Sequence, residues 1–551
     1  MAGYLITKAL SFPVIFKGNA ISFQEAERQF FTHTSGRWLY NEEAQRKARY
    51  APFSVGALMN IAGKTVGSPV RHIQKLVDKD NRAFNLVHEN GVETIARIPT
   101  PINGPPGLVT ASEVATIDFV RRLGLPVPKV LEWSALAQST EVGSPFILME
   151  KVAGTTLQEV SLMHGVRIDD FLVDVPEDVD VSPFCVGPIA RRDFWDDERL
   201  SMKDIFPGPW TCALDFARDT AAREQKWIAN FAKPHMEDSW LCCIPHQGRE
   251  DDHIDFLERY KTLLPYLIPK DPRHLHGHLW HPRLDGDTLF VVPSTSSRAP
   301  GEAIKVDISA CITWPGATIE PAFLQLATPA SFRNLYALCS AFEGVYLPDF
   351  SKYEANTLET GEKDKALHDH FERIAFEGLG IDDAHLPNLV VRKALDVMAR
   401  KTWRTGLIPF KQALVEVTQN FSKIAPGALC PISFTPNEIA QHNVAYEGWA
   451  REKLMAAMMM MQLHVEQHGY VRAWEGHPDH FEQVQQEVEK WHEIHMMLPQ
   501  EETEGDGYSR ALTWPLRNTL DDHPRSHCYP AYMDIYVLPF YSLYFAQTSP
   551  N

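Results

Sequence analysis

Residues 279–291, "LWHPRLDGDTLFV", bring together side chains that can act on a phosphorylated molecule. The loop carries an imidazole, a guanidinium and two carboxylates, namely His281, Arg283, Asp285 and Asp287, ahead of a short apolar strand. An imidazole can act as a base, carboxylates hold Mg²⁺, and a guanidinium binds phosphate or carboxylate. These residue types fit group transfer to a small molecule. "LDGD" is also an ordinary Asp-Gly turn, and that interpretation is favoured for the two aspartates.

Neighbouring residues widen the choice of base and of metal ligand. Asp307 lies on the apolar segment "AIKVDIS" and is a third carboxylate for Mg²⁺. His274, His276 and His278 alternate along the chain, and alternate residues of an extended segment share one face. No carboxylate or thiol set accompanies them, so a partly exposed cluster is favoured over a zinc site. His278 remains an alternative to His281 as a base.

The composition limits the classes of partner. The chain has 551 residues and 44% hydrophobic side chains, which indicates a folded protein of two or three structural units. Acidic side chains outnumber basic ones by 71 to 53, so the net charge of -18 disfavours nucleic acid. The eight cysteines include no CxxC pair, which argues against a zinc or disulfide framework. No apolar run approaches the ~20 residues of a membrane helix, so no membrane span is expected.

The elements that must position these residues change type along the chain. Residues 84–101 predict a β-hairpin that turns at "NG", 108–124 predict a helix, and 125–134 and 144–154 predict two further strands. Helical periodicity then dominates, at 211–232, 252–264, 331–346, 363–378, 388–420, 436–468 and 477–496. This order predicts an α+β fold with a small β-rich lobe followed by a large helical lobe.

Longer segments lie along most of the chain: "FFTHTSGRWLYNEE", "ETIARIPTP", "TASEVAT", "LPVPKVLEWS", "FILMEKVAGTTL", "LPYLIPKDP", "LWHPRL" and "EPAFLQ". Together they resemble the aminoglycoside-phosphotransferase-like kinases, and more closely the fungal altered-inheritance-of-mitochondria branch of that family. The resemblance implies a two-lobed, protein-kinase-like fold with helical extensions and a nucleotide between the lobes. The expected parts are an N-terminal extension (1–66), an N-lobe (67–154), a C-lobe (155–430) and a C-terminal helical extension (431–551).

The resemblance implies three residues that contact the cofactor. A kinase-like site holds phosphate with a basic strand residue that a helix carboxylate fixes in place. Arg97 in "TIARIP" takes the basic position, Glu113 in "TASEVAT" takes the helix position, and Glu150 ends "FILME". Arginine clamps phosphate bidentately, so its use in place of lysine is a mild departure. The alternative is that Arg97 and Glu113 form only an ion pair between two elements, and both interpretations stay open.

The positions that the resemblance assigns to catalysis carry unsuitable side chains. Arg283 stands at the catalytic base, Thr288 at the metal-binding amide five residues later, and Thr313 in "CITWPG" at the metal-binding aspartate. Arginine stays protonated in proteins, and threonine is a poorer Mg²⁺ ligand than asparagine or aspartate. The expected glycine-rich loop, "LVDKDNRAFN", has no glycine, and its acids Asp78 and Asp80 would repel phosphate.

Two functions follow from this pattern. The favoured one is a degenerate phosphotransferase, a pseudokinase that binds or scaffolds and holds ATP or another nucleotide without a metal, through Arg97, Glu113 and Arg283. The lost ligands argue against Mg²⁺. The alternative is an active transferase with a rebuilt site, in which at least two of the carboxylates would lie within ~5 Å of one point. Those carboxylates are Asp285, Asp287 and Asp307.

The expected partners are a small molecule or nucleotide between the lobes and a protein that contacts the C-terminal helices. The resemblance implies a mitochondrial location. The N-terminal segment supports it weakly, because it has no acid before Glu25 and carries Lys8 and Lys17 but no arginine. The cytoplasm is the alternative location.

Overall fold

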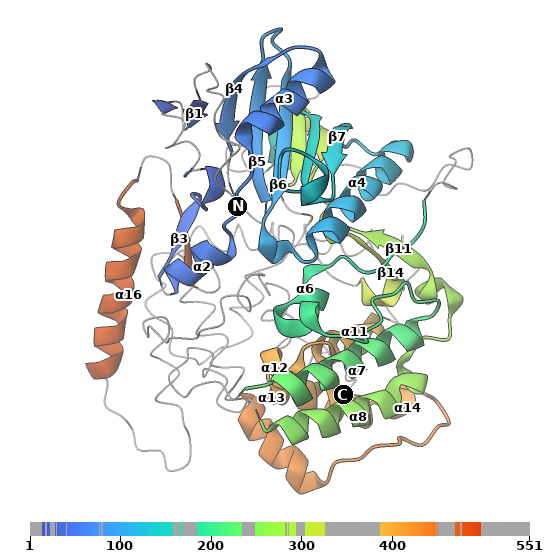
Figure 1. Cartoon of the computed structure of the whole chain (residues 1–551). Coiled ribbons are helices and arrows are strands. Elements are labelled where there is room, and N and C mark those ends of the chain that lie inside the picture. The colour runs from blue at the N-terminus through green and yellow to red at the C-terminus, as the bar shows by residue number, and fades with distance from the viewer. Residues whose placement is uncertain are drawn as a thin grey trace.

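The computed structural model describes residues 14–16, 19–21, 28, 30–39, 41–76, 78, 81–157, 166–167, 184–233, 248–281, 284, 286–293, 304–325, 386–447, 449, 465, 469–473 and 477–497. Figure 1 shows these residues as a β-rich lobe stacked on a helical lobe. We call the part up to Glu150 the N-lobe and the described part of 151–449 the C-lobe.

The N-lobe is built on a seven-stranded sheet with the order β2-β1-β4-β5-β6-β8-β7. Its centre is the antiparallel hairpin of β5 (Asn81–His88) and β6 (Glu93–Pro99), which turns at Gly91 with a φ of 83°. This confirms the hairpin expected at 84–101. The other strands are β1 (Val14–Phe16), β2 (Asn19–Ile21), β4 (Val70–Lys75), β7 (Val130–Ser134) and β8 (Phe146–Glu150).

One face of this sheet is covered by residues that lie between β2 and β4 in the chain. Helix α3 (Val55–Val66) begins at Ser54, whose side chain accepts a hydrogen bond from the N–H of Ala57, and it ends at Gly67 in the left-handed region. Alternate residues of β5 and β6 point to this face and bury an apolar core with α3 and the segment ahead of it: Phe30, Phe31, Leu58, Phe84, Leu86, Ala96 and Ile98. Core residues between Phe30 and Ala62, which the sequence placed in an extension, therefore belong to the N-lobe.

Helix α4 (Pro106–Arg122) joins the N-lobe to the C-lobe. It confirms the helix expected at 108–124, and Gly124 follows its end with a φ of 84°. Ile117 and Val120 of this helix pack in one core with Leu289, Cys311 and Trp314 of the C-lobe. The backbone N–H of Cys311 also donates to the carbonyl of Pro126 over 2.7 Å. Apolar burial between the lobes thus fixes α4 on the part of the C-lobe that carries the candidate loop.

Two small sheets form the upper part of the C-lobe. The first has the order β10-β13-β12-β9, with β9 (Thr155–Thr156), β10 (Val166–Arg167), β12 (Leu289–Pro293) and β13 (Ile304–Cys311). The second pairs β11 (Gly277–Trp280) with β14 (Thr318–Pro321). The candidate loop runs between β11 and β12, and the turn that contains Thr313 runs between β13 and β14. Each sheet therefore holds one end of both segments.

The rest of the described C-lobe is helical. A large apolar core lies between α7 (Ala213–Phe231), α8 (Glu250–Leu267), α11 (Leu386–Ala399) and α13 (Leu407–Gln419). The helices expected at 211–232 and 252–264 are confirmed. The helix expected over 388–420 is divided, because Gly406 with a φ of 90° ends the short α12 (Thr402–Thr405). Short α6 (Arg192–Trp195) and α14 (Phe421–Ile424) also belong to this lobe, and residues 436–447 are helical. The helices expected at 331–346 and 363–378 lie outside the described residues.

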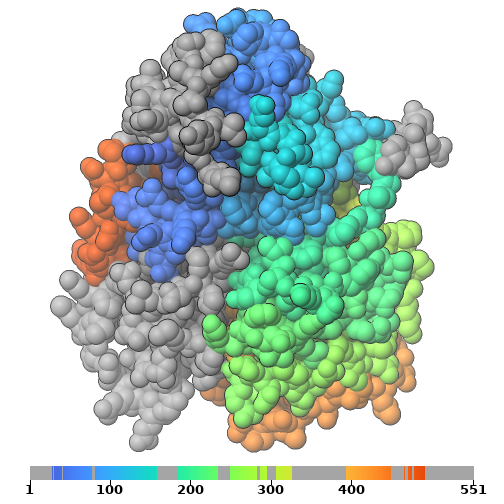
Figure 2. Space-filling model, viewed as in Figure 1, coloured from blue at the N-terminus to red at the C-terminus, as the bar shows by residue number. Residues whose placement is uncertain are grey.

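Segments from the two ends of the chain lie side by side. Strand β3 (Gly36–Trp38), followed by α2 (Glu42–Ala48), pairs antiparallel with β15 (Tyr470–Arg472). Helix α16 (His480–Met497), which confirms the helix expected at 477–496, follows β15. Figures 1 and 2 both show α16, in orange, beside the blue N-terminal elements.

The element order confirms the α+β class, with a β-rich N-lobe followed by a helical C-lobe. The N-terminal part contributes strands as well as helices, which differs from the helical extension that the sequence suggested. Throughout the described part of the chain, every helix is too short or too polar to cross a membrane.

Candidate functional site

Arg97 and Glu113 meet at the inner face of the N-lobe sheet. Arg97 lies on β6 in register with Ala83 and Ile147, and Glu113 lies on α4. An Nη1 of Arg97 donates to an Oε1 of Glu113, and the two side chains are only 11% and 4% exposed. The structure therefore brings together the first two residues that the sequence singled out. The loss of either partner would leave a buried charge uncompensated, so the pair fixes α4 on the sheet.

The carboxylate of Glu113 also contacts the C-lobe. It accepts a hydrogen bond from the backbone N–H of Trp314. Burial raises the pKa of Glu113 above its ordinary value, while Arg97 and the Trp314 N–H act in the opposite direction. One carboxylate thus links β6, α4 and the turn after β13. The turn is therefore connected to Arg97 through the carboxylate of Glu113.

The turn after β13 holds Thr313 in an unusual backbone conformation. Thr313 has a φ of 73°, in the left-handed region that β-branched residues rarely adopt. His281 accounts for part of this geometry, because its Nε2 lies 3.0 Å from the Ile312 carbonyl and its ring packs edge-on against Trp314 at 4.5 Å. His281, a candidate base in the sequence, is thus engaged in supporting the turn. Such strain persists only where the surroundings fix it.

The described part of the candidate loop lies against this turn. The backbone N–H of Ile312 donates to the Thr288 carbonyl over 2.8 Å, and Thr288 is 3% exposed. Asp287 is 24% exposed and lies 4.0 Å from Nη1 of Arg472, which comes from β15. Arg283 and Asp285 lie outside the described residues. Thr288 and Thr313 therefore lie on neighbouring segments, and their assignment to metal-ligand positions stays a prediction.

Asp307 lies further along the C-lobe hairpin. It pairs with Val292, whereas Cys311 pairs with Leu289 beside the candidate loop. Val292 lies three residue steps beyond Leu289. At about 3.3 Å per residue, Asp307 is therefore about 10 Å along the hairpin from the end next to the loop. Asp307 is also exposed. The hairpin register therefore carries this carboxylate away from Asp287.

Glu150, the third residue expected at the cofactor, lies at the end of β8. Its Oε1 accepts a hydrogen bond from the backbone N–H of Lys129 over 2.8 Å and pairs with Arg121 at 3.3 Å. Its side chain is 44% exposed. These contacts tie β8 to the segment that leads into β7. The structure does not bring Glu150 to Arg97 and Glu113 through any described contact.

The loop between β4 and β5 differs from the expectation that its acids repel phosphate. Asp78 is 3% exposed, and its Oδ2 lies 2.6 Å from Nζ of Lys75. The same oxygen accepts from the backbone N–H of Thr34 over 3.0 Å, and the N–H of Asp78 donates to Ser35 Oγ. The Asp78 charge is neutralised inside the N-lobe and does not face a ligand. Lys79 and Asp80 lie outside the described residues.

Sequence reasoning missed Asn85, which lies on the same face of the sheet as Arg97. It pairs with Ile95 of β6, two residues from Arg97, and it is 7% exposed. Its Nδ2 donates to Glu93 Oε2 over 2.6 Å, which fixes the carboxamide, and its Oδ1 has no hydrogen-bond partner among the described residues. A polar residue at a regularly buried strand position was the available signal. The structure thus offers one buried acceptor near Arg97.

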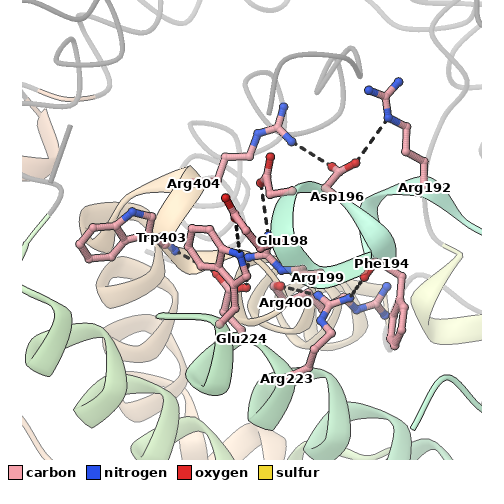
Figure 3. Close-up of polar contacts among 12 residues, drawn as sticks. Arg192, Phe194, Asp196, Glu198, Arg199, Arg223, Glu224, Arg400, Trp403 and Arg404 are labelled. Atoms are coloured by element: carbon pink, nitrogen blue, oxygen red, sulfur yellow. Dashed lines mark hydrogen bonds and ion pairs between the residues drawn. The ribbon is translucent and has the colours of Figure 1, made fainter. Parts of the chain in front are cut away.

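A buried charge network holds the segment around α6 on the C-lobe helices (Figure 3). Asp196 accepts from Arg192 at 3.4 Å and from Arg404 at 3.1 Å. Arg199 pairs with Glu224, whose side chain is fully buried on α7. Arg192 and Arg404 thus share Asp196, and Arg223 donates to the backbone carbonyls of Phe194 and Arg400. These contacts tie the segment around α6 to the C-lobe helices.

This network also braces the turn that contains Thr313. Arg191 precedes α6, and its Nη1 donates to Oε1 of Glu320 on β14 over 2.6 Å. A Cβ added to Gly316 would lie 3.4 Å from the Cα of Arg191, so the two backbones pack closely. The segment ahead of α6 thus packs against the turn and is tied to β14 by the Arg191–Glu320 pair. Thr313 is held between this segment and His281.

The upstream histidines do not form a metal site in the described residues. His274 is buried, at 3% exposure, and His278 has a pKa lowered by partial burial and by the neighbouring His276. Within the ranges that the structure describes, no three His, Cys, Asp or Glu side chains are arranged to hold a metal ion.

Comparisons with known proteins relate the chain to fungal sequences. No protein-family model matches it. Over 80% of its length it is 26% identical to a subtelomeric hrmA-associated cluster protein of Aspergillus fumigatus, and it covers 96% of that protein. It is also 30% identical, over 165 residues, to a Candida dubliniensis protein called altered inheritance of mitochondria protein 9, mitochondrial. This match covers 24% of the present chain and 26% of the Candida protein.

Solved kinase-type structures align over much of the chain at low similarity. A Plasmodium vivax ethanolamine kinase covers 68% of this chain and 82% of its own, with 10% identity and a TM-score of 0.30. A spectinomycin phosphotransferase in complex with ADP and spectinomycin covers 72% of this chain and 99% of its own, with 10% identity and a TM-score of 0.28. These TM-scores are low, and the two-lobed assignment rests on the order of the elements described above.

Proposed function

We propose that this chain is a kinase-like pseudoenzyme that binds a nucleotide between its lobes without a metal ion and serves as a binding or scaffolding protein. The observation that carries the proposal is Thr313. Its backbone keeps a strained left-handed conformation beside the Arg97–Glu113 pair, while its side chain lacks the carboxylate that metal-dependent transfer needs. The framework of a phosphate site is retained, and its metal ligands are not.

The phosphate-binding side of the proposal is supported by Arg97. Its guanidinium has five N–H donors, and Nη1 donates to Glu113. A phosphate oxygen can be bound by the remaining donors, with no metal ion required. The side chain is 11% exposed, so its charge acts in a poorly hydrated setting where Coulomb attraction is strong.

The base-binding side is supported by Asn85. A buried carbonyl oxygen without a partner costs about 1–3 kcal/mol, and a ligand that donates a hydrogen bond to it removes that cost. Glu93 accepts from Nδ2 of Asn85, so the carbonyl oxygen and not the amine is left without a partner among the described residues. The proposal therefore expects a nucleobase with an exocyclic amino group.

The decisive experiment is a thermal shift of the full chain with ATP, ADP or GTP, each with Mg²⁺ or with EDTA. A ligand at 100 times its Kd stabilises the folded state by about 2.7 kcal/mol, so binding raises the Tm. We expect a shift with ATP that EDTA leaves intact. A shift that needs Mg²⁺, together with turnover, would instead establish the alternative of an active transferase rebuilt around Asp285 or Asp287. No shift with any nucleotide would refute nucleotide binding.

Matched variants assign the shift to the site. The double variant Arg97→Met, Glu113→Leu removes both charges together, which keeps the core apolar and is expected to abolish the shift. The control is Arg122→Met, which removes an exposed arginine of the same lobe that pairs with Asp118 on α4. For base selectivity, Asn85→Val should equalise ATP and ITP, because ITP carries an oxo group where ATP carries the amino group.

The location is a separate proposal. The mitochondrial setting is supported by the resemblance and by the name of the Candida dubliniensis relative, which matches a quarter of the chain. Subcellular fractionation of the full chain tests it, and a cytosolic fraction that contains all of the protein would overturn it.

A further inference from the structure

Strand β15 brings a late segment of the chain to the edge of the candidate site. Gly36, Arg37 and Trp38 pair with Arg472, Val471 and Tyr470. The pairing extends one residue beyond each end: Leu39 N–H donates to Gly469 O, and Ala473 N–H donates to Ser35 O, each over 2.9 Å. A two-stranded ribbon is marginal alone. Other contacts must therefore hold β15 in place.

An aromatic cluster supplies the first of these contacts. Tyr470 packs against Trp38 and His33 with ring centroids 5.0 and 5.6 Å apart, and its hydroxyl lies 3.0 Å from His33 Nε2. His33 and Trp38 are 7% and 4% exposed, and Tyr470, itself half-buried, packs over them. Aromatic pairs of this kind contribute beyond their buried area. The cluster thus holds one specific residue of the C-terminal segment.

Close backbone packing sets the register. A Cβ on Gly36 would lie 2.5 Å from the Val471 carbonyl oxygen and 2.5 Å from the Tyr470 ring. Both are far inside van der Waals contact, and the Val471 oxygen cannot move without breaking the strand pairing. Gly36 is therefore required for the close approach of β15, and any larger residue there acts on this contact.

Arg37 ties the following helix to the same place. It pairs with Glu42 of α2 and with Glu482 of α16, each at 3.0 Å, and its guanidinium lies 4.0 Å from the Phe481 ring centroid. Figure 2 shows α16 lying along the N-terminal part of the surface. Exposed ion pairs contribute little each, so α16 reinforces the docking while the aromatic cluster dominates it.

The ribbon of β3 and β15, with the residues directly ahead of β3, contacts both loops of the candidate site. On the N-lobe side, Thr34 and Ser35, directly ahead of β3, hold the β4–β5 loop through Asp78. On the C-lobe side, Arg472 of β15 lies 4.0 Å from Asp287 in the candidate loop. The β3–β15 ribbon is therefore one continuous connection between the two loops, built from opposite ends of the chain.

We propose that β15 is a positioning element of the candidate site, which sets the separation of the β4–β5 loop and the 286–288 loop and so couples its own docking to ligand binding. Docking and ligand binding then favour each other by the same factor, because coupling is reciprocal. The ligand part rests on the proposed function, whereas the coupling of the two loops does not.

The test uses hydrogen exchange of the full chain without ligand, comparing Gly36→Ala with Gly187→Ala. Gly187 is exposed, and an added Cβ there meets nothing within 4 Å, so it is a matched control. We expect Gly36→Ala to speed exchange tenfold or more at residues 469–473, and also at peptides that contain Asp78 and Asp287. Faster exchange at 469–473 alone would show an independent tail and overturn the proposal. Exchange equal to the control would overturn it as well.

Tyr470→Ala provides a second route if Gly36→Ala fails to fold. It removes the ring from the late segment and leaves the N-lobe residues unchanged, so the same three regions should exchange faster. With ATP as the probe, thermal shifts at several ATP concentrations give an apparent affinity. For Tyr470→Ala this apparent affinity should be at least threefold lower than for the wild type. If the wild type shows no shift, the nucleotide proposal fails, and the ligand-free exchange still decides the coupling of the loops.

Discussion

Acidification should release β15, because His33 is buried in its neutral form. Burial, followed by the charges of Arg49, Lys75, Arg82 and Arg46, lowers the pKa of His33 from 6.5 to about 2. Protonation is therefore strongly disfavoured while Tyr470 is docked. The hydroxyl of Tyr470 can serve either as donor or as acceptor to a neutral ring, but it does not offset a charge.

The size of the effect follows from linkage. Above pH 6.5 the histidine is neutral in both the docked and the released state, so docking does not depend on pH. Below 6.5 the released state binds a proton that the docked state does not, and docking weakens by up to about 1.4 kcal/mol per pH unit. Between pH 7.5 and 5.5 the loss is about 1.4 kcal/mol, which is a population change of roughly tenfold.

The assay is hydrogen exchange at 469–473, corrected for the intrinsic pH dependence of amide exchange. Protection of this segment should fall about tenfold between pH 7.5 and 5.5, and His33→Gln should remove the pH dependence. The local measurement matters because His442 of the C-lobe, with a pKa lowered to about 4 by burial, adds to the pH dependence of global stability. Protection that is equal at both pH values would refute the buried, neutral state of His33.

Urea unfolding tests three further predictions, two at the candidate site and one in the C-lobe network. Thr313→Asn should raise the free energy of unfolding by about 1 kcal/mol, because asparagine tolerates the left-handed region; an unchanged or lower value would show that the turn is not strained. Arg97→Met should cost about 3–5 kcal/mol by leaving Glu113 buried and unpaired, and adding Glu113→Leu should recover most of it. If Glu113→Leu recovers less than half of the lost free energy of unfolding, Arg97 must stabilise the fold through contacts other than Glu113. Glu224→Ala should cost a similar 3–5 kcal/mol, because Arg199 loses its buried partner, and a cost below 1 kcal/mol would count against the network in Figure 3.

Elements with a clear local period were predictable from the sequence. The hairpin of β5 and β6 has alternating residues and an Asn-Gly turn, and α4 has helical spacing closed by Gly124. The resemblance, and not these patterns, placed Arg97 and Glu113 in one site, and the structure brings them together in an ion pair. The assignment of Thr288 and Thr313 to metal-ligand positions likewise came from the resemblance and stays a prediction.

Features that depend on contacts between distant segments could not be predicted. Strand β3 has three residues, and so has β15, which is too short for a periodic signal. The pairing of Asp78 with Lys75 needs the β4–β5 loop to fold back on Thr34, so the sequence suggested a repulsive acid where the structure has a neutralised one. The free carbonyl of Asn85 is visible only once Glu93 has taken its amide.

The ribbon of β3 and β15 has a consequence for how the chain is made. His33 and Tyr470, which touch in the folded protein, are 437 positions apart. At a synthesis rate of about 5–20 residues per second, the ribosome needs roughly 20 to 90 s to deliver Tyr470 after His33. During that time β3 presents an unpaired edge, the kind of surface that recruits other strands. In a nascent or prematurely terminated chain, β3 therefore has no β15 to pair with. We expect chaperones to bind the N-lobe chiefly before residues 470–472 have been synthesised.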